Sequence, residues 1–150
     1  MVLTNDQTIC TIVPKGNTRE GDRRYVVIVA VLVNEPERSK IVTLTKGMDL
    51  LAPGSVHWEI GNALSAIIKR KAILAHQVEA VLKAYRQIPI RLIDVDMDRA
   101  LQIALEQNIY AYDAYMIECA KENRCELISL DKGLLEAAAR AGVEVLEVPV

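Results

Sequence analysis

Asp113 is an acidic residue at a position where the helical pattern of the chain calls for an apolar side chain. With about 100° between successive helical residues, it falls within the stripe formed by Met116, Ile117 and Ala120. An ionised carboxylate on a buried helix face is costly unless it is paired or bound to a metal. The structural alternative is an N-cap or first-turn aspartate, which the helix dipole stabilises. Asp113 is therefore the first candidate for a functional carboxylate.

Two further acidic residues follow predicted strands. Asp131 ends the apolar segment 127–130 and leads directly into a helix. It is either a helix N-cap or an acid in the crevice beyond the carboxyl ends of parallel strands. Glu59 lies at the edge of the apolar stripe of the helix that follows a strand ending near Pro53. It is either a solvated glutamate or a third acid near the carboxyl edge of the sheet.

These three carboxylates predict a metal site. Like charges brought together disfavour joint ionisation unless a cation neutralises them. Oxygen ligands suit a hard ion, Mg²⁺ or Mn²⁺, and such sites activate water for phosphodiester cleavage. His57 and His76 are isolated, and a cluster without a histidine, cysteine or serine partner argues against a nucleophilic triad. We therefore expect Glu59, Asp113 and Asp131 to be both the metal ligands and the catalytic residues.

The elements that must position these acids alternate between apolar strands and helices. Strands are predicted at 49–53, 90–95, 126–130 and 143–148, and helices at 37–47, 56–70, 75–87, 96–108, 112–123 and 133–140. The apolar run 25–33 is too short to assign by periodicity, and its β-branched residues favour a buried strand in its first half. This alternation predicts an α/β fold, a three-layer α/β/α sandwich around a mainly parallel sheet.

Length and composition indicate one soluble domain. The chain has 150 residues, of which 51% are hydrophobic and 25% charged. Residues 1–24 show little periodicity, so they are interpreted as an extension of uncertain order preceding a domain at 25–150. No apolar stretch approaches the ~18 residues typical of a membrane span, and the N-terminus does not resemble a secretory signal. These features predict a cytoplasmic protein without membrane contact.

The formal net charge of −2 gives the chain no overall basic excess of the kind that nucleic-acid binding usually requires. Any contact with RNA would therefore depend on local basic patches. Basic residues gather at Arg19, Arg23 and Arg24 and again at 69–71, although each group also fits a solvated surface. The single tryptophan, Trp58, lies opposite the apolar stripe of its helix. Packing of Trp58 against a neighbouring element or a partner is favoured over stacking on RNA.

Four segments resemble the motifs of PIN domains, and the resemblance as a whole covers about residues 25–148, most of the chain. They are Asn34-Glu35-Pro36-Glu37-Arg38, Leu51-Ala52-Pro53 with Trp58-Glu59-Ile60-Gly61-Asn62-Ala63-Leu64, Ala111-Tyr112-Asp113-Ala114-Tyr115, and Ile128-Ser129-Leu130-Asp131-Lys132. Their order and spacing are similar above all to bacterial VapC-like toxins. The resemblance implies a Mg²⁺-dependent endoribonuclease that acts on RNA, forms a homodimer and is held inactive by a cognate antitoxin.

The sequence departs from the PIN pattern at its start. In the family the first strand ends in an aspartate, and a helix then leads into the Asn-Glu-Pro segment. Here residues 25–33 contain no acid, as if the aspartate and part of the helix were deleted. Asp22 precedes this run and Glu35 follows it, so neither takes the aspartate's place. The resemblance therefore predicts impaired cation binding and impaired cleavage.

Two other interpretations stay open. A degenerate PIN domain would bind an antitoxin or RNA without cleaving it. A Rossmann-like ligand-binding domain is the third, although no glycine-rich phosphate loop follows any predicted strand. An acid near the carboxyl end of the first strand would favour the nuclease over the binding module.

Overall fold

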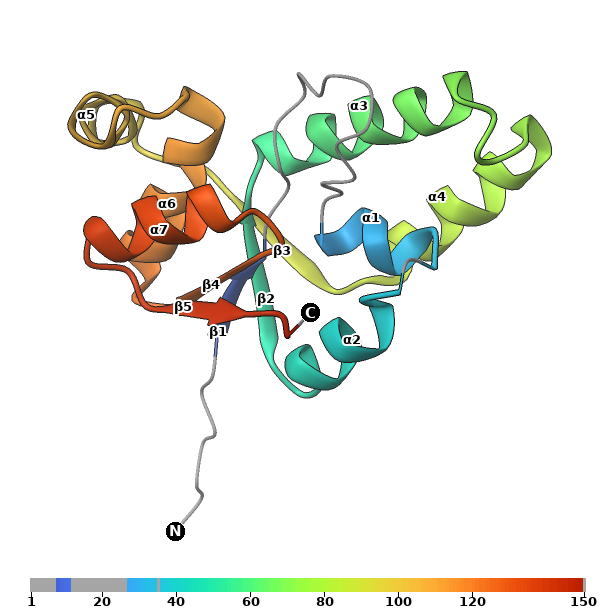
Figure 1. Cartoon of the computed structure of the whole chain (residues 1–150), viewed down its shortest axis with the longest axis horizontal. Coiled ribbons are helices and arrows are strands. Elements are labelled where there is room, and N and C mark those ends of the chain that lie inside the picture. The colour runs from blue at the N-terminus through green and yellow to red at the C-terminus, as the bar shows by residue number, and fades with distance from the viewer. Residues whose placement is uncertain (1–7, 12–26, 35, 150) are drawn as a thin grey trace, which may run out of the picture.

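A five-stranded parallel sheet forms the centre of the molecule (Figure 1). The structure, a computed structural model, describes residues 8–11, 27–34 and 36–149. The sheet has the order β3-β2-β1-β4-β5, and every neighbouring pair is parallel. Its strands are β1 (Thr8–Thr11), β2 (Asp49–Pro53), β3 (Ile90–Ile93), β4 (Glu126–Ser129) and β5 (Val145–Glu147). The order reverses at β1, so the switch point lies between β1 and β4.

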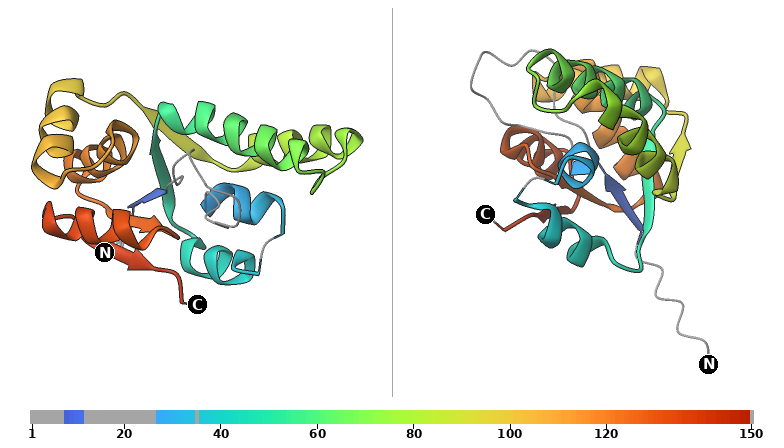
Figure 2. Two further views of the ribbon diagram at one scale, coloured as in Figure 1. Left: turned by 45° about the horizontal axis from the view of Figure 1, so that its top comes forward. Right: turned by 90° about the vertical axis from the view of Figure 1, so that its right-hand side faces the viewer.

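Helices connect the strands. They are α1 (Val27–Leu32), α2 (Arg38–Thr45), α3 (Ser55–Lys69), the 3₁₀ turn η1 (Ala75–Gln77), α4 (Val78–Gln87), α5 (Met97–Gln107), α6 (Ala111–Asn123) and α7 (Lys132–Arg140). Local side-chain and backbone chemistry sets both ends of α5. At its start the Asp96 carboxylate accepts a hydrogen bond from the Arg99 N–H at 3.1 Å, and at its end Asn108 adopts a left-handed conformation with a φ of 53°. Helices α3 and α4 extend together away from the strands (Figure 2). None of the helices in the described ranges is long and apolar enough to span a bilayer.

The hydrophobic core has two parts, one on each face of the sheet. Leu127 of β4 belongs to the larger cluster, which includes side chains of α3, α5, α6 and α7. The next residue, Ile128, belongs to a smaller cluster with Ile41 of α2 and Val148. Because successive side chains of a strand point to opposite faces, helices cover both sides of the sheet. The predicted α/β fold with parallel strands is confirmed.

The strand predicted in the first half of residues 25–33 is wrong, because Val27–Leu32 form helix α1. Ile28 and Val29 join the larger core cluster, whereas Val27 and Ala30 join the smaller one. A helix buried on both sides has the same continuous apolar sequence as a buried strand. The strand between β2 and β4 is instead β1, which lies within the segment interpreted as an extension.

An ion pair between the buried Glu118 of α6 and the exposed Arg99 of α5 joins the two helices. Glu118 is only 3% exposed, although the helical pattern did not place it among the buried residues. Its Oε1 lies 3.5 Å from Nη1 of Arg99, which also lies 3.5 Å from Oε1 of Glu122. Burial raises the pKa of Glu118, and the charge of Arg99 opposes that shift. Arg99 therefore compensates for a carboxylate that would otherwise be buried without a partner.

The Arg99→Ala variant is expected to lower the free energy of unfolding by about 1–3 kcal/mol, because Glu118 loses its cation while staying buried. Urea denaturation at neutral pH measures this loss. Arg86→Ala, which removes an exposed arginine of α4, is the matched control and should change stability far less. Equal stability of the two variants would show that Arg99 does not compensate for the Glu118 charge.

Candidate functional site

Glu59 is a buried carboxylate near the start of α3, just beyond the carboxyl end of β2. Its side chain is 8% exposed, and Oε1 accepts no hydrogen bond from any residue that the structure describes. The interpretation of Glu59 as a solvated glutamate is therefore wrong. A buried acceptor without a donor is unfavourable in an ordinary core, which makes this oxygen a candidate ligand atom.

Asp113 lies in the first turn of α6 and acts electrostatically on Glu59. Burial raises the pKa of Glu59 to about 8, and the negative charge of Asp113 contributes to that rise. The Ser55 hydroxyl, one turn earlier in α3, opposes the shift, although its oxygen makes no hydrogen bond of good geometry to a described residue. The starts of α3 and α6 thus place these two carboxylates within electrostatic reach of each other.

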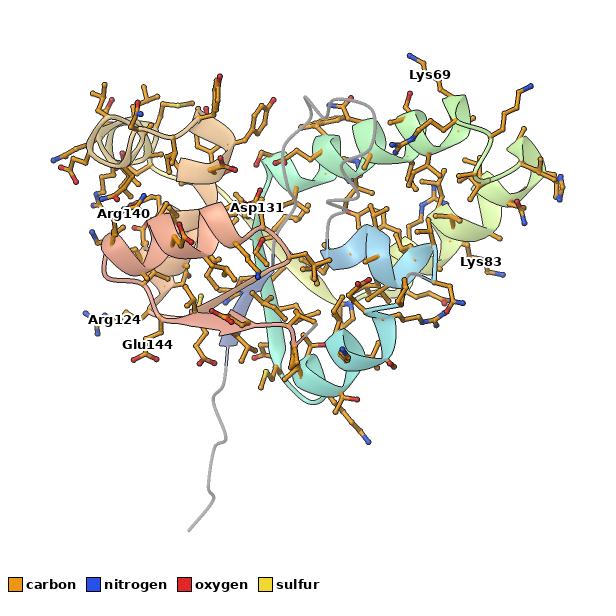
Figure 3. The ribbon with its side chains drawn as sticks, in the orientation of Figure 1. Lys69, Lys83, Arg124, Asp131, Arg140 and Glu144 are labelled. Carbon is orange, nitrogen blue, oxygen red and sulfur yellow. The ribbon has the colours of Figure 1, made fainter. Side chains whose placement is uncertain are left out.

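Asp131 follows β4 and caps α7. Its Oδ1 accepts hydrogen bonds from the N–H groups of Gly133 at 2.8 Å and Leu134 at 3.2 Å. Its own N–H donates to the buried Ser129 hydroxyl at 2.9 Å. The predicted position at the carboxyl end of a strand is confirmed, and so is the N-cap interpretation. Figure 3 shows Asp131 near the centre of the molecule, at the start of α7.

The basic patch at the end of α3 does not lie near these acids. Figure 3 shows Lys69 at the outer end of α3, far from Asp131. Ten residues separate Lys69 from Glu59, which corresponds to about 15 Å along a helix. Lys132, exposed and next to Asp131, is a cation at the acidic edge that the sequence did not single out.

The predicted three-acid metal site is only partly tested by the residues that the structure describes. Within residues 8–11, 27–34 and 36–149, no three histidine, cysteine, aspartate or glutamate side chains are placed so that they could hold a metal ion. The convergence of all three acids therefore stays a prediction. Asp22, Glu35 and the arginines at 19, 23 and 24 lie outside the described residues.

The first strand carries no acid of its own. The sequence of β1 is Thr-Ile-Cys-Thr, and the chain continues with Ile12 and Val13. Thr11 is paired in register with Ile128, three residues before Asp131. The carboxyl ends of β1 and β4 are therefore adjacent, and only the β4 side is followed at once by a carboxylate.

Comparison with known proteins identifies the family. The sequence model of the PIN domain matches residues 26–140, which is most of the chain. The chain belongs to the PIN family. PIN domains are ribonucleases and generally use divalent metal ions. In this PIN domain the match begins at residue 26, so the central strand β1 lies upstream of the matched residues.

The fold of this PIN domain is similar to that of solved structures. A crystal structure of PAE2754 from Pyrobaculum aerophilum superposes with a TM-score of 0.58 at 16% sequence identity. The alignment covers 95% of this chain and 91% of that one. At this identity the likeness supports the fold alone. A search of curated protein sequences gave no significant match.

The residues present fit a divalent cation. Oε1 of Glu59 is buried without a donor among the described residues, and a second carboxylate, Asp113, lies close enough to raise the Glu59 pKa. A hard cation would satisfy the acceptor and remove the repulsion between the charges. This PIN domain therefore retains an oxygen-only donor pair suited to the metals that its family uses.

Without divalent ions, stability should fall as the pH rises from about 5 to 8. The pKa of Glu59 is 4.5 for the model compound and about 8 in the fold, so the folded state keeps a proton that the unfolded chain releases. The stabilisation is complete below the unfolded pKa and is lost as pH rises through the folded one. Thermal unfolding from pH 5 to 8 should show a steep decline, which Glu59→Gln flattens.

Glu136→Gln, an exposed position on α7, is the control and should keep the wild-type slope. Added Mg²⁺ should restore stability of the wild-type protein near pH 8, because an ion that binds only the folded state shifts the equilibrium toward it. Parallel curves for wild type and Glu59→Gln would contradict the buried, proton-binding state of Glu59.

Proposed function

We propose that this PIN domain is a metal-dependent endoribonuclease of the toxin–antitoxin type with weakened activity. One observation carries the proposal: the Glu59 carboxylate is buried near the start of α3, one of its oxygens has no partner among the described residues, and Asp113 lies beside it. A structural role would provide such a carboxylate with a donor or a cation. A cation-binding role explains why the residues that the structure describes provide neither.

Glu59 and Asp113 would hold a Mg²⁺ or Mn²⁺ ion, with Asp131 as the third acid. When bound, such an ion activates water and neutralises charge on the phosphate. The two N–H groups that bind Oδ1 of Asp131 fix the orientation of that carboxylate. Lys132 provides a positive charge beside Asp131 for the RNA backbone. The carboxylate of Asp131 therefore has a defined orientation before RNA arrives.

Weakened activity follows from the number of ligands. In the family pattern an aspartate ends the first strand, whereas β1 here contains no acid and is followed by Ile12 and Val13. A site with one carboxylate fewer attracts a divalent cation less strongly. Mg²⁺ rests on one or two carboxylates in many sites, so Glu59, Asp113 and Asp131 can support slow cleavage.

A degenerate PIN domain that only binds a partner is the second candidate. It is favoured by exposed apolar side chains at one-turn spacing on α5: Met97 is 54% exposed, Leu101 45% and Leu105 83%. Such a stripe suits an apolar partner surface, either that of a cognate antitoxin or that of a second copy of the chain. This interpretation keeps the interactions of the toxin family without its cleavage.

The test is RNA cleavage by the purified protein with Mg²⁺ or Mn²⁺, beside a reaction with EDTA. We expect slow cleavage at internal positions that stops when the metal is chelated. Cleavage that continues in EDTA would exclude the metal site. No cleavage at any metal concentration, together with a stable complex with RNA or an antitoxin, would favour the binding module.

A further inference from the structure

Ser55, the first residue of α3, carries a buried hydroxyl that the described part of the chain does not satisfy. Its Oγ makes no hydrogen bond of good geometry to a described residue. Among the described residues that are not exposed, the only other buried side-chain oxygen or nitrogen in this condition is Oε1 of Glu59, on the same helix. Buried polar groups without partners are rare in folded proteins, so two of them within one helix need a common explanation.

The two groups are neighbours on one face of α3, because their residues are four apart in the helix. Side chains at that spacing have Cβ atoms about 5–6 Å apart. The residues that follow them, Val56 and Ile60, are 0% and 1% exposed, so core packing fixes the rotation of the helix about its axis. Burial raises the pKa of Glu59, and the Ser55 hydroxyl lowers it, as a hydrogen-bond donor within reach does. A polar pair thus runs directly beside an apolar one.

The start of α3 is also fixed to the sheet. Gly54, the residue before the helix, donates its N–H to the Ile93 carbonyl of β3 at 3.0 Å. Ile93 is the register partner of Pro53, the last residue of β2. Ser55 follows this anchor directly, so its backbone has a defined place at the carboxyl edge of the two strands.

The usual structural roles of a helical hydroxyl do not apply to Ser55. In α2, Thr43 and Thr45 each donate to the carbonyl four residues earlier, at 2.8 Å. The residue four before Ser55 is Leu51, which lies in β2 and not in a helix. Nor is Ser55 the N-cap, since that position belongs to Gly54. Alanine would serve equally well at this position in a purely structural helix.

A hydroxyl beside a carboxylate can orient it. Serine has one hydrogen to donate, whereas an ionised carboxylate only accepts and has about four sites at which to do so. The Glu59 carboxylate can therefore accept from Ser55 and still offer lone pairs to a cation. Carboxylates that bind metals are commonly held by such hydrogen bonds, and loss of the partner typically costs 10–100-fold in affinity or activity.

We propose that Ser55 is a positioning residue of the cation site, whose hydroxyl donates to the Glu59 carboxylate and fixes it in the orientation that binds a divalent cation. This inference rests on the proposed metal-dependent function and deepens it. It adds to the acids a neutral group that acts through Glu59 and needs no contact with RNA. The unpartnered hydroxyl and the unpartnered carboxylate oxygen then have one explanation.

Calorimetric titration with Mn²⁺ at constant pH tests the role. Ser55→Ala should bind Mn²⁺ about tenfold more weakly than the wild type, the lower end of the effect of such partners. Ser55→Thr keeps the hydroxyl and should restore most of the affinity. Ser65→Ala removes an exposed hydroxyl from the same helix, so it is the matched control and should bind as the wild type does.

Thermal unfolding separates positioning from a structural role. In EDTA, Ser55→Ala should unfold at the wild-type temperature or above it, because it removes an unsatisfied buried hydroxyl and introduces a better helix former. Mn²⁺ should then raise the transition temperature of this variant less than that of the wild type, since stabilisation by a ligand follows its affinity. A structural hydroxyl would give the opposite result: a lower transition temperature in EDTA and an unchanged affinity for Mn²⁺.

The outcomes separate this inference from the proposed function. Wild-type affinity in Ser55→Ala would overturn the positioning role, and so would a loss in Ser55→Thr as large as that in Ser55→Ala. Mn²⁺-dependent RNA cleavage by the wild type would leave the nuclease proposal intact in either case. A wild-type protein that binds no Mn²⁺ at millimolar concentrations would overturn both proposals.

Discussion

Removal of residues 1–24 is expected to abolish the folded state. The deleted segment contains β1, which lies between β2 and β4 and pairs with both. Without it, the β3–β2 pair and the β4–β5 pair lose the strand that joins them into one sheet. Their inner edges would expose unpaired backbone groups in the middle of the domain, where each unpaired group is costly. Far-ultraviolet circular dichroism and gel filtration of residues 25–150 should show an unfolded or aggregated chain.

A single substitution tests the same point without shortening the chain. Ile9→Pro removes a backbone donor from the middle of β1, and it should prevent folding, because proline is found essentially only on edge strands or at bulges. Ile9→Val keeps both the donor and the β-branched side chain, so it is the matched control and should fold normally. A cooperative thermal transition for residues 25–150, at the temperature of the full chain, would show that β1 is dispensable.

Asp113→Asn is expected to lower metal-dependent RNA cleavage by about a hundredfold or more. Changes one step removed from a metal already cost 10–100-fold in affinity or activity, and Asp113 is proposed as a direct ligand. The substitution also removes the charge that contributes to the raised Glu59 pKa, so Glu59 should ionise at lower pH in the variant. Initial cleavage rates at several Mn²⁺ concentrations measure the loss, and calorimetry with Mn²⁺ shows whether binding weakens in parallel.

Asp98→Asn is the matched control, because Asp98 is also a first-turn aspartate, placed on α5 and exposed. It should cleave like the wild type. Asp131→Asn is a second informative variant: asparagine caps a helix as well as aspartate does, so the fold should survive while the charge is lost. Full activity in Asp113→Asn would move the chemistry elsewhere, and Asp22 and Glu35 would be the next residues to replace.

The sequence by itself determined much of the framework. The strand at 49–53 was predicted with its observed bounds, and α5 is capped by Asp96 and Asn108 as the sequence indicated. These features depend on chemistry within a few residues, such as a carboxylate that accepts from the third following N–H or a left-handed residue that ends a helix. The position of Asp131 after β4 has the same local origin.

Only the tertiary structure decided which segment forms the central strand. A run of buried β-branched residues is compatible with a strand or with a helix packed on both sides, and Val27–Leu32 took the second form. The partners of β1 lie about 40 and 120 residues further along the chain, at distances that no local pattern reports. The tertiary structure also decided the burial of Glu59 and Glu118, because the burial of each side chain depends on which helix packs against the helix that carries it. Periodicity shows which face of a helix is apolar, whereas the three-dimensional packing decides how far that burial extends around it.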